Sequence, residues 1–428
     1  MYRVMLALPA LMLSPAVAHA QDEQETAAPV SSQLAQRAEN IIAAMREEMA
    51  YDAVFAQSFR DQVPEEQFRS INAQLQAQFG PLIGLETINP VSDNAAELNI
   101  RFERGRADTV IQLEPAEPNY VFGFLIRGVE PVNDTTQSVE EALAALPGNV
   151  SLLATRLDGS DPIISYNADT PLGLGSAFKL YVLSALNQSI AAGEHSWDDI
   201  VPLSQSSFPS GILQEWPEGS PVTLHTLATL MISISDNTAT DQLIAVLGRD
   251  AIEAEIAASG HSDPARMQPF MNTRELFVLK SGGPEGIDGF RDAAPDDRRR
   301  LLEALGTMIP SENDIMAAFS NGPNAIDIEW FASANDIAAI FERLRSTQDR
   351  IALGIMGVNP AVPDSELTHW DYVGFKGGSE PGVLNFSYLL QDTEGNWSVV
   401  TMGWNNPDAE VDQQQFNLIA MRAIALVR

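Results

Sequence analysis

Residues 175–183 read GSAFKLYVL, which places a serine and a lysine at the head of an apolar helical stretch. Ser176 and Lys179 are three positions apart, so a helix puts both side chains on one face. A serine hydroxyl is a weak nucleophile until a base removes its proton, and an uncharged lysine can be that base. The backbone N–H of Ser176, at a helix N-terminus, could also bind a developing oxyanion. The segment predicts an activated serine, although a Ser-x-x-Lys pair by itself is a common sequence.

Two further segments carry residue types that such a serine needs. Residues 233–239 read SISDNTA between two apolar helical stripes, so a tight inter-helix turn would bring the Ser235 hydroxyl and the Asn237 carboxamide to one cleft. Residues 374–379 read GFKGGS on an expected strand, where Lys376 supplies a cation and the glycines allow close approach of a substrate. Taken singly, the first segment is an ordinary turn and the second an ordinary strand end.

The lysines are few. Only Lys179, Lys280 and Lys376 occur among the 25 basic residues. Arginine stays protonated at any working pH, whereas a desolvated lysine can lose its proton, so lysine in an arginine-biased chain points to chemistry. Lys280, in VLKSG, lacks such a setting and is interpreted as a surface charge at a helix end. The chain has no cysteine, and its histidines show no metal-ligand spacing, so no metal or cofactor is expected.

In this chain order, Ser-x-x-Lys, Ser-Asp-Asn and Lys-x-Gly resemble the motif set of class A β-lactamases, within the penicillin-recognising serine hydrolase superfamily. The separation of 235 − 176 = 59 residues also fits. The resemblance covers about residues 138–428. It implies that Ser176 is the acylated nucleophile, that Lys179 is its base or a proton-shuttle partner, and that Ser235 protonates the departing nitrogen. It further implies that Asn237, Lys376, Gly378 and Ser379 bind the substrate. The backbone N–H groups of Ser176 and Ser379 would form the oxyanion hole.

Two departures from the family pattern bear on the activity. The residue after the strand lysine is usually Thr or Ser in the family, where its hydroxyl binds the substrate carboxylate, but it is Gly377 here. The Glu-x-x-x-Asn loop that activates the deacylating water is also missing. Glu275 is the nearest candidate for a deacylation base. The preferred interpretation is that Asn272 or Thr273 caps a helix with Glu275 in its first turn.

The N-terminal part divides into three segments. Residues 1–20 read as a secretory signal peptide with a small-x-small cleavage site, and residues 21–32 as a polar, flexible leader. Residues 33–132 show helical spacing and then period-two strands, an α+β module that resembles the NTF2-like modules found ahead of some exported serine hydrolases. The expected strands of this module are Leu82–Ile88, Ala96–Glu103, Thr109–Leu113 and Tyr120–Val129.

Residues 138–428 are predicted to form the hydrolase domain. Strand patterns stand at both ends of this segment, with a helix-rich middle between them. This order predicts an α+β fold with one antiparallel, β-lactamase/transpeptidase-like sheet flanked by helices, in which the first and last strands are neighbours. The expected strands are Val150–Arg156, Pro162–Asn167, Asp371–Gly377, Val383–Leu390 and Trp397–Met402, with a closing helix over Val411–Val427.

The net negative charge of the chain limits the classes of partner that it can bind. With 58 acidic against 25 basic residues, a nucleic-acid partner or an anionic membrane surface is disfavoured. The expected partner is a small β-lactam or peptidoglycan-derived substrate, with no membrane insertion after signal cleavage and an undetermined oligomeric state. The sequence therefore predicts an exported, periplasmic serine hydrolase, foremost for β-lactam rings. A D,D-peptidase, esterase or amidase is one alternative, and a slowly deacylating penicillin- or peptidoglycan-binding sensor or scaffold is another.

Overall fold

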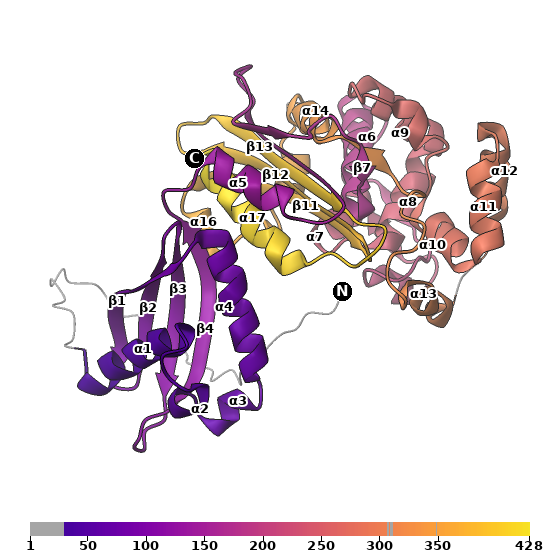
Figure 1. Ribbon diagram of the computed structural model, residues 1–428. Helices are drawn as coiled ribbons and strands as arrows, with labels where there is room; N and C mark the ends of the chain where they lie inside the picture. Colours follow the sequence, from indigo (N-terminus) through magenta and orange to yellow (C-terminus); the bar gives the residue numbers. More distant parts are fainter. Residues whose placement is uncertain (1–29, 306–307, 309–310, 348) are drawn as a thin grey trace. The chain divides into compact units, whose positions relative to one another are not determined.

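The computed structural model describes residues 30–428 except 306–307, 309–310 and 348. The predicted signal peptide and residues 21–29 of the predicted leader lie outside the described residues. The chain divides into two compact units (Figure 1). The smaller unit holds the described residues up to Ala73 with Pro81–Phe102 and Ala107–Arg127, and the larger holds Gln74–Gly80, Glu103–Arg106 and Gly128–Arg428. Among the described residues, no helix combines the length and apolar character needed to cross a membrane.

The N-terminal elements are helices followed by a four-stranded sheet of order β1-β2-β3-β4, as the sequence predicts. Residues of β2 and β3 alternate between buried and partly buried, which is the pattern of strands with one face on a core. The likeness to NTF2-like modules stays a prediction. The elements are α1 (Ser32–Met45), α2 (Tyr51–Val54), α3 (Gln57–Arg60), α4 (Glu65–Phe79), β1 (Leu82–Ser92), β2 (Ala95–Phe102), β3 (Gly105–Leu113) and β4 (Val121–Pro131).

The larger unit is built on a five-stranded sheet of order β11-β12-β13-β5-β6. Its neighbouring strands all pair antiparallel, and β13 lies beside β5, so the predicted pairing of the last strand with the first is confirmed. The mixed α+β class is confirmed as well. The strands are β5 (Asn149–Arg156), β6 (Ile164–Tyr166), β11 (Trp370–Glu380), β12 (Val383–Asp392) and β13 (Trp397–Asn405).

Helices cover both faces of this sheet (Figure 1). On one face, Tyr388 and Val400 belong to the hydrophobic core that contains α5 (Thr136–Ala144) and α17 (Gln413–Ala425). On the other face, Leu389 belongs to the core of the remaining helical layer. Because both faces are covered, β12 and β13 are nearly continuous runs of buried residues instead of alternating ones.

The helical layer surrounds α6, whose first nine residues are all buried. A helix that is apolar on all sides is stable only inside such a layer. The remaining elements are β7 (Leu172–Gly173), η1 (Gly175–Phe178), α6 (Lys179–Ala191), β8 (Ile200–Pro202), η2 (Leu213–Glu215), β9 (Pro221–Thr223), α7 (Leu224–Ser233), α8 (Asn237–Leu247), α9 (Arg249–Ala258), η3 (Pro264–Met267), α10 (Thr273–Ser281), α11 (Pro284–Asp292), α12 (Pro295–Leu305), α13 (Glu312–Phe319), β10 (Phe331–Ala332), α14 (Ala334–Arg345), α15 (Ile351–Met356) and α16 (Asp364–Leu367).

Candidate active site

Ser176 lies in η1, the turn of 3₁₀ helix that leads directly into α6. The sequence predicts a position in the first turn of an α-helix, and the structure instead places Ser176 in a 3₁₀ turn whose first residue, Gly175, has a left-handed φ of 50°. Ser176 is partly exposed, whereas its neighbours on both sides are buried. Among the described residues, no hydrogen bond joins Ser176 Oγ to Lys179 Nζ.

Ser235 lies in the short link between α7 and α8 and has a left-handed φ of 59°. Asp236 fixes this link, because its carboxylate caps α8 through the Ala239 N–H at 2.8 Å and accepts the Ile212 N–H at 2.7 Å. The predicted inter-helix turn is present. It turns the Ser235 hydroxyl and the Asn237 carboxamide towards the same lysine amine.

The Lys179 amine is completely buried and is the meeting point of the site. Its Nζ donates to Ser235 O at 2.7 Å, Ser235 Oγ at 3.1 Å and Asn237 Oδ1 at 2.7 Å. Burial, followed by the charge of Lys376, holds the pKa of Lys179 well below its usual range. A lysine in this setting can be uncharged at neutral pH, which is the state that a general base requires.

Lys376 reaches the same hydroxyl from β11. Its Nζ donates to Ser235 Oγ at 3.1 Å and to Gly377 O at 2.7 Å. Burial lowers the pKa of Lys376 to about 7. The Ser235 hydroxyl therefore lies between two buried amines, 3.1 Å from each. The structure brings together Lys179, the Ser235–Asn237 link and Lys376, which come from three separate segments of the chain.

The backbone of β11 lies directly against the nucleophile turn. A Cβ atom on Gly378 would be 2.0 Å from Leu174 O and 2.5 Å from Ser176 N. A Cβ atom on Gly175 would be 2.7 Å from Ser379 N. The turn and the strand thus leave no room for a side chain at Gly175 or Gly378, and Ser176 and Ser379 lie next to these glycines, one on the turn and one on the strand. The strand continues to Glu380, past the predicted end at Gly377, because it keeps its pairing with β12.

A comparison with protein families agrees with this architecture. The model described as the beta-lactamase enzyme family matches residues 134–359, which is more than half of the chain. The chain belongs to the beta-lactamase enzyme family. The matched segment contains Ser176, Lys179, Ser235 and Asn237 and ends before Lys376.

Solved structures of this kind of protein are also similar to the chain, at low identity. A beta-lactamase from Sphaerobacter thermophilus is 22% identical, with a TM-score of 0.46 over 67% of this chain and 95% of that one. A beta-lactamase from Chitinophaga pinensis is 18% identical, with a TM-score of 0.48 over 69% and 98%. PBP-A is 17% identical, with a TM-score of 0.47 over 68% and 94%. No curated protein matches the chain. These likenesses carry no information on substrates.

In this beta-lactamase family member, Glu275 is occupied at both carboxylate oxygens. Oε1 binds Arg249 Nη2 at 2.6 Å, and Oε2 accepts the Asn272 N–H at 2.8 Å, while Asn272 Oδ1 caps α10 through the Glu275 N–H at 2.8 Å. The predicted capping arrangement is therefore present. Among the described residues, no hydrogen bond links Glu275 to Ser176 or Lys179. A deacylation role for Glu275 stays a prediction that these contacts do not support.

The glycine that follows the strand lysine has a packing reason. A Cβ atom on Gly377 would lie 2.8 Å from Cζ of Phe375 and 3.2 Å from Asn385 O. The Phe375 ring therefore takes the space that a threonine or serine side chain needs, and this position offers no hydroxyl to a substrate carboxylate. No group of three or more acidic or histidine side chains in the described part of the chain is placed to hold a metal ion.

The prediction for Lys280 is wrong. Its side chain is fully buried, and Nζ pairs with Glu380 Oε1 at 2.6 Å. No local pattern indicates this ion pair, because Glu380 lies on β11, 100 positions further along the chain. Sequence reasoning also missed Glu329, which is buried and accepts the Gly175 N–H at 2.9 Å. The sequence offers one hint that a buried charge pair lies near the site, because Glu380 directly follows the oxyanion candidate Ser379.

Proposed function

We propose that the protein is an exported serine hydrolase that forms an acyl-serine intermediate at Ser176, with β-lactam rings as its foremost substrates. The observation that carries the proposal is the Ser235 hydroxyl held 3.1 Å from two buried amines, one of them with a strongly depressed pKa. A base close to the nucleophile and a hydroxyl that can pass protons onward are what acyl transfer from an amide requires.

Acylation then proceeds in two proton-balanced steps. Lys179 Nζ takes the proton of Ser176 Oγ as this oxygen bonds to the substrate carbonyl carbon. The negative charge on the carbonyl oxygen is stabilised by the N–H groups of Ser176 and Ser379. The C–N bond breaks while Ser235 gives its proton to the departing nitrogen, and Lys179 returns the proton it holds to Ser235 across the 3.1 Å contact. Lys376, charged below about pH 7, attracts an anionic group on the substrate.

Two observations favour alternative outcomes within the same chemistry. Glu275 is engaged by Arg249 and by the helix cap, which favours slow deacylation and a penicillin- or peptidoglycan-binding sensor. The missing hydroxyl at Gly377 favours a D,D-peptidase, esterase or amidase that depends less on a substrate carboxylate. All of these alternatives keep Ser176 as the acylated residue and differ in what is bound and released.

Intact-protein mass after mixing with a penicillin separates these possibilities. We expect the wild-type protein to gain the mass of one penicillin and the Ser176→Ala variant to gain none, because the hydroxyl is the attacking group. An adduct that appears and decays indicates a β-lactamase, and a long-lived adduct indicates the sensor. An adduct on Ser176→Ala would contradict the assignment of the nucleophile. Absence of any adduct, with hydrolysis of ester substrates, would favour the esterase.

The export proposal rests on residues 1–20, which read as a signal peptide with a small-x-small site at Ala18-His19-Ala20. We expect N-terminal sequencing of the protein recovered from its native cell envelope to begin at Gln21. A mature protein that begins at Met1 would contradict export. The N-terminal unit is proposed as an NTF2-like binding or spacing module, since its sequence contains no recognisable catalytic motif.

A further inference from the structure

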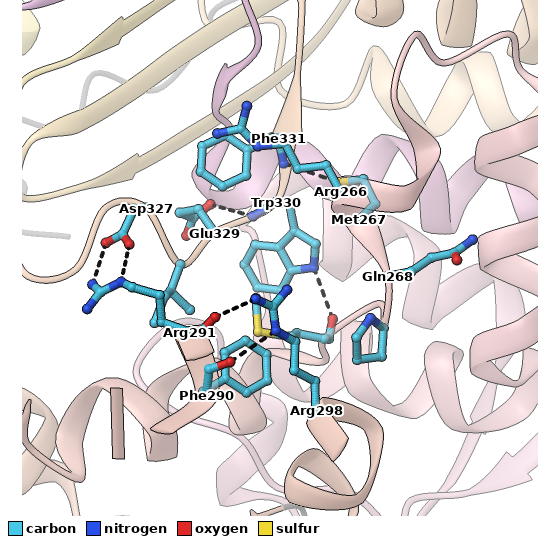
Figure 2. Close-up of a pocket in the computed structure, with 13 residues that line it drawn as sticks. Arg266, Met267, Gln268, Phe290, Arg291, Arg298, Asp327, Glu329, Trp330 and Phe331 are labelled. Atoms are coloured by element: carbon cyan, nitrogen blue, oxygen red, sulfur yellow. Dashed lines mark hydrogen bonds and ion pairs between the residues drawn. The ribbon is translucent and has the colours of Figure 1, made fainter. Parts of the chain in front are cut away.

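The larger unit contains a cavity of about 220 Å³ beside the segment that precedes α14 (Figure 2). Its walls include the carboxylate of Glu329 and three arginines, Arg266, Arg291 and Arg298. These arginines have contacts of their own. Arg291 pairs with Asp327 at 2.6 Å, Arg298 donates to Phe290 O and Arg291 O, and Arg266 stacks on the Phe331 ring at 3.7 Å. Glu329 forms no ion pair with any of them in the described part of the chain.

Glu329 is tied to the nucleophile turn. It is 5% exposed, and its Oε2 accepts the N–H of Gly175 at 2.9 Å and that of Trp330 at 3.2 Å. Its Oε1 is buried and finds no hydrogen-bond partner among the described residues. Burying a charged carboxylate with an unpaired oxygen costs much free energy of solvation, whereas burying a protonated carboxyl costs much less.

A second buried carboxyl lies on the other side of the same backbone contact. Glu380 is itself the residue after Ser379, one of the two proposed oxyanion donors. Glu329 accepts the N–H of Gly175, the residue before Ser176, which is the other proposed donor. Lys280 pairs with Glu380 at 2.6 Å, and their side chains are 0% and 8% exposed. This buried group therefore contains one cation and two carboxyls, and it is neutral only if one carboxyl keeps a proton.

The electrostatic balance selects Glu329 as the proton carrier. Burial, followed by the charge of Glu380, raises the pKa of Glu329 to about 8, against the opposing effect of Lys280. Burial also raises the pKa of Glu380, but Lys280 in direct contact opposes that rise, so Glu380 is the carboxyl that this ion pair favours in the charged form. Two carboxyls that share a buried site cannot both ionise without a large electrostatic penalty.

We propose that Glu329 is a positioning residue that, in its protonated form, anchors the nucleophile turn and keeps the region behind the oxyanion donors free of net negative charge. This inference rests on the proposed acylation of Ser176. Ionisation of Glu329 would place an uncompensated anion behind the amides that must stabilise another anion in the transition state. Acylation should therefore slow as Glu329 loses its proton.

Glu329→Gln tests the inference, because glutamine has the same shape, still accepts the two N–H bonds and cannot ionise. We expect the ratio of the acylation rate of Glu329→Gln to that of wild type to rise by about tenfold between pH 7 and pH 9. Titration of Lys376 affects both proteins and cancels in this ratio. The control is Asp327→Asn, which removes a carboxylate from the same cavity wall and should leave the ratio flat. Parallel pH profiles for Glu329→Gln and wild type would overturn the inference.

Urea unfolding against pH gives a readout that does not depend on activity. A carboxyl with a raised pKa in the folded state stabilises the protein fully below its unfolded pKa, and this stability is lost as the pH rises through its folded pKa. Between about pH 4.5 and pH 8, the free energy of unfolding of wild type should fall more steeply with pH than that of Glu329→Gln. The difference between the two slopes should correspond to one proton released on unfolding. Equal slopes would overturn the inference. A slope difference in a protein that never acylates Ser176 would instead overturn the proposed function and with it the catalytic part of this inference.

Discussion

Replacing Lys179 with arginine should abolish acylation of Ser176, with a loss of about 10³-fold or more in the acylation rate. Arginine keeps the positive charge but cannot release its proton at any working pH, so it cannot serve as the base. The site is built for an uncharged amine, since Lys179 is fully buried and lies near the charge of Lys376. The measurement is the rate of adduct formation with a penicillin, followed by intact-protein mass.

Lys376→Arg is the matched control for this prediction. It changes the other lysine that contacts Ser235 Oγ while keeping the charge that the proposal assigns to Lys376. We expect this variant to weaken acylation much less than Lys179→Arg does. Circular dichroism of both variants checks that they fold. Acylation of Lys179→Arg at the wild-type rate would remove Lys179 from its role as base.

Replacing Gly378 with alanine should also have a large effect, on both activity and stability. The added Cβ would lie 2.0 Å from Leu174 O and 2.5 Å from Ser176 N, and both are backbone atoms that cannot swing away. The strand and the nucleophile turn must then separate, which misplaces the oxyanion donors. We expect acylation to fall by about 10²- to 10³-fold and the free energy of unfolding to fall by about 1–3 kcal/mol.

Gly354→Ala is the control for this second prediction. Gly354 lies in α15, and apart from its chain neighbours and the backbone of its own helix no atom lies within 4 Å of the added Cβ, so the same chemical change should leave acylation unaltered. Its stability should stay equal or rise slightly, because alanine favours a helix over glycine. Denaturant unfolding of the two variants side by side gives the comparison. Normal stability and activity in Gly378→Ala would show that the close contact between strand and turn is not required.

The sequence alone determined the parts of the site that depend on short-range geometry. Ser176 and Lys179 follow from one segment, the short turn that leads directly into α6, and Ser235 with Asn237 follows from one tight link between helices. The strand lysine was found by the same local argument. The sheet was also predictable, since strand patterns with turn residues between them mark most of its strands, although the order that places β13 beside β5 had to be inferred from their positions at the ends of the domain.

The tertiary structure alone decided the electrostatics. Nothing near Lys179 in the sequence states that it is fully buried beside a second lysine, yet these two facts depress its pKa. Lys280 reads as a surface charge, but it pairs in the interior with Glu380. Glu329 has no role that the sequence indicates, but it accepts the N–H of the nucleophile turn. Desolvation and the attraction or repulsion of charges depend on which distant segments pack together. A local pattern of residues can therefore identify the groups that are expected to react, whereas their protonation states depend on how the folded chain packs around them.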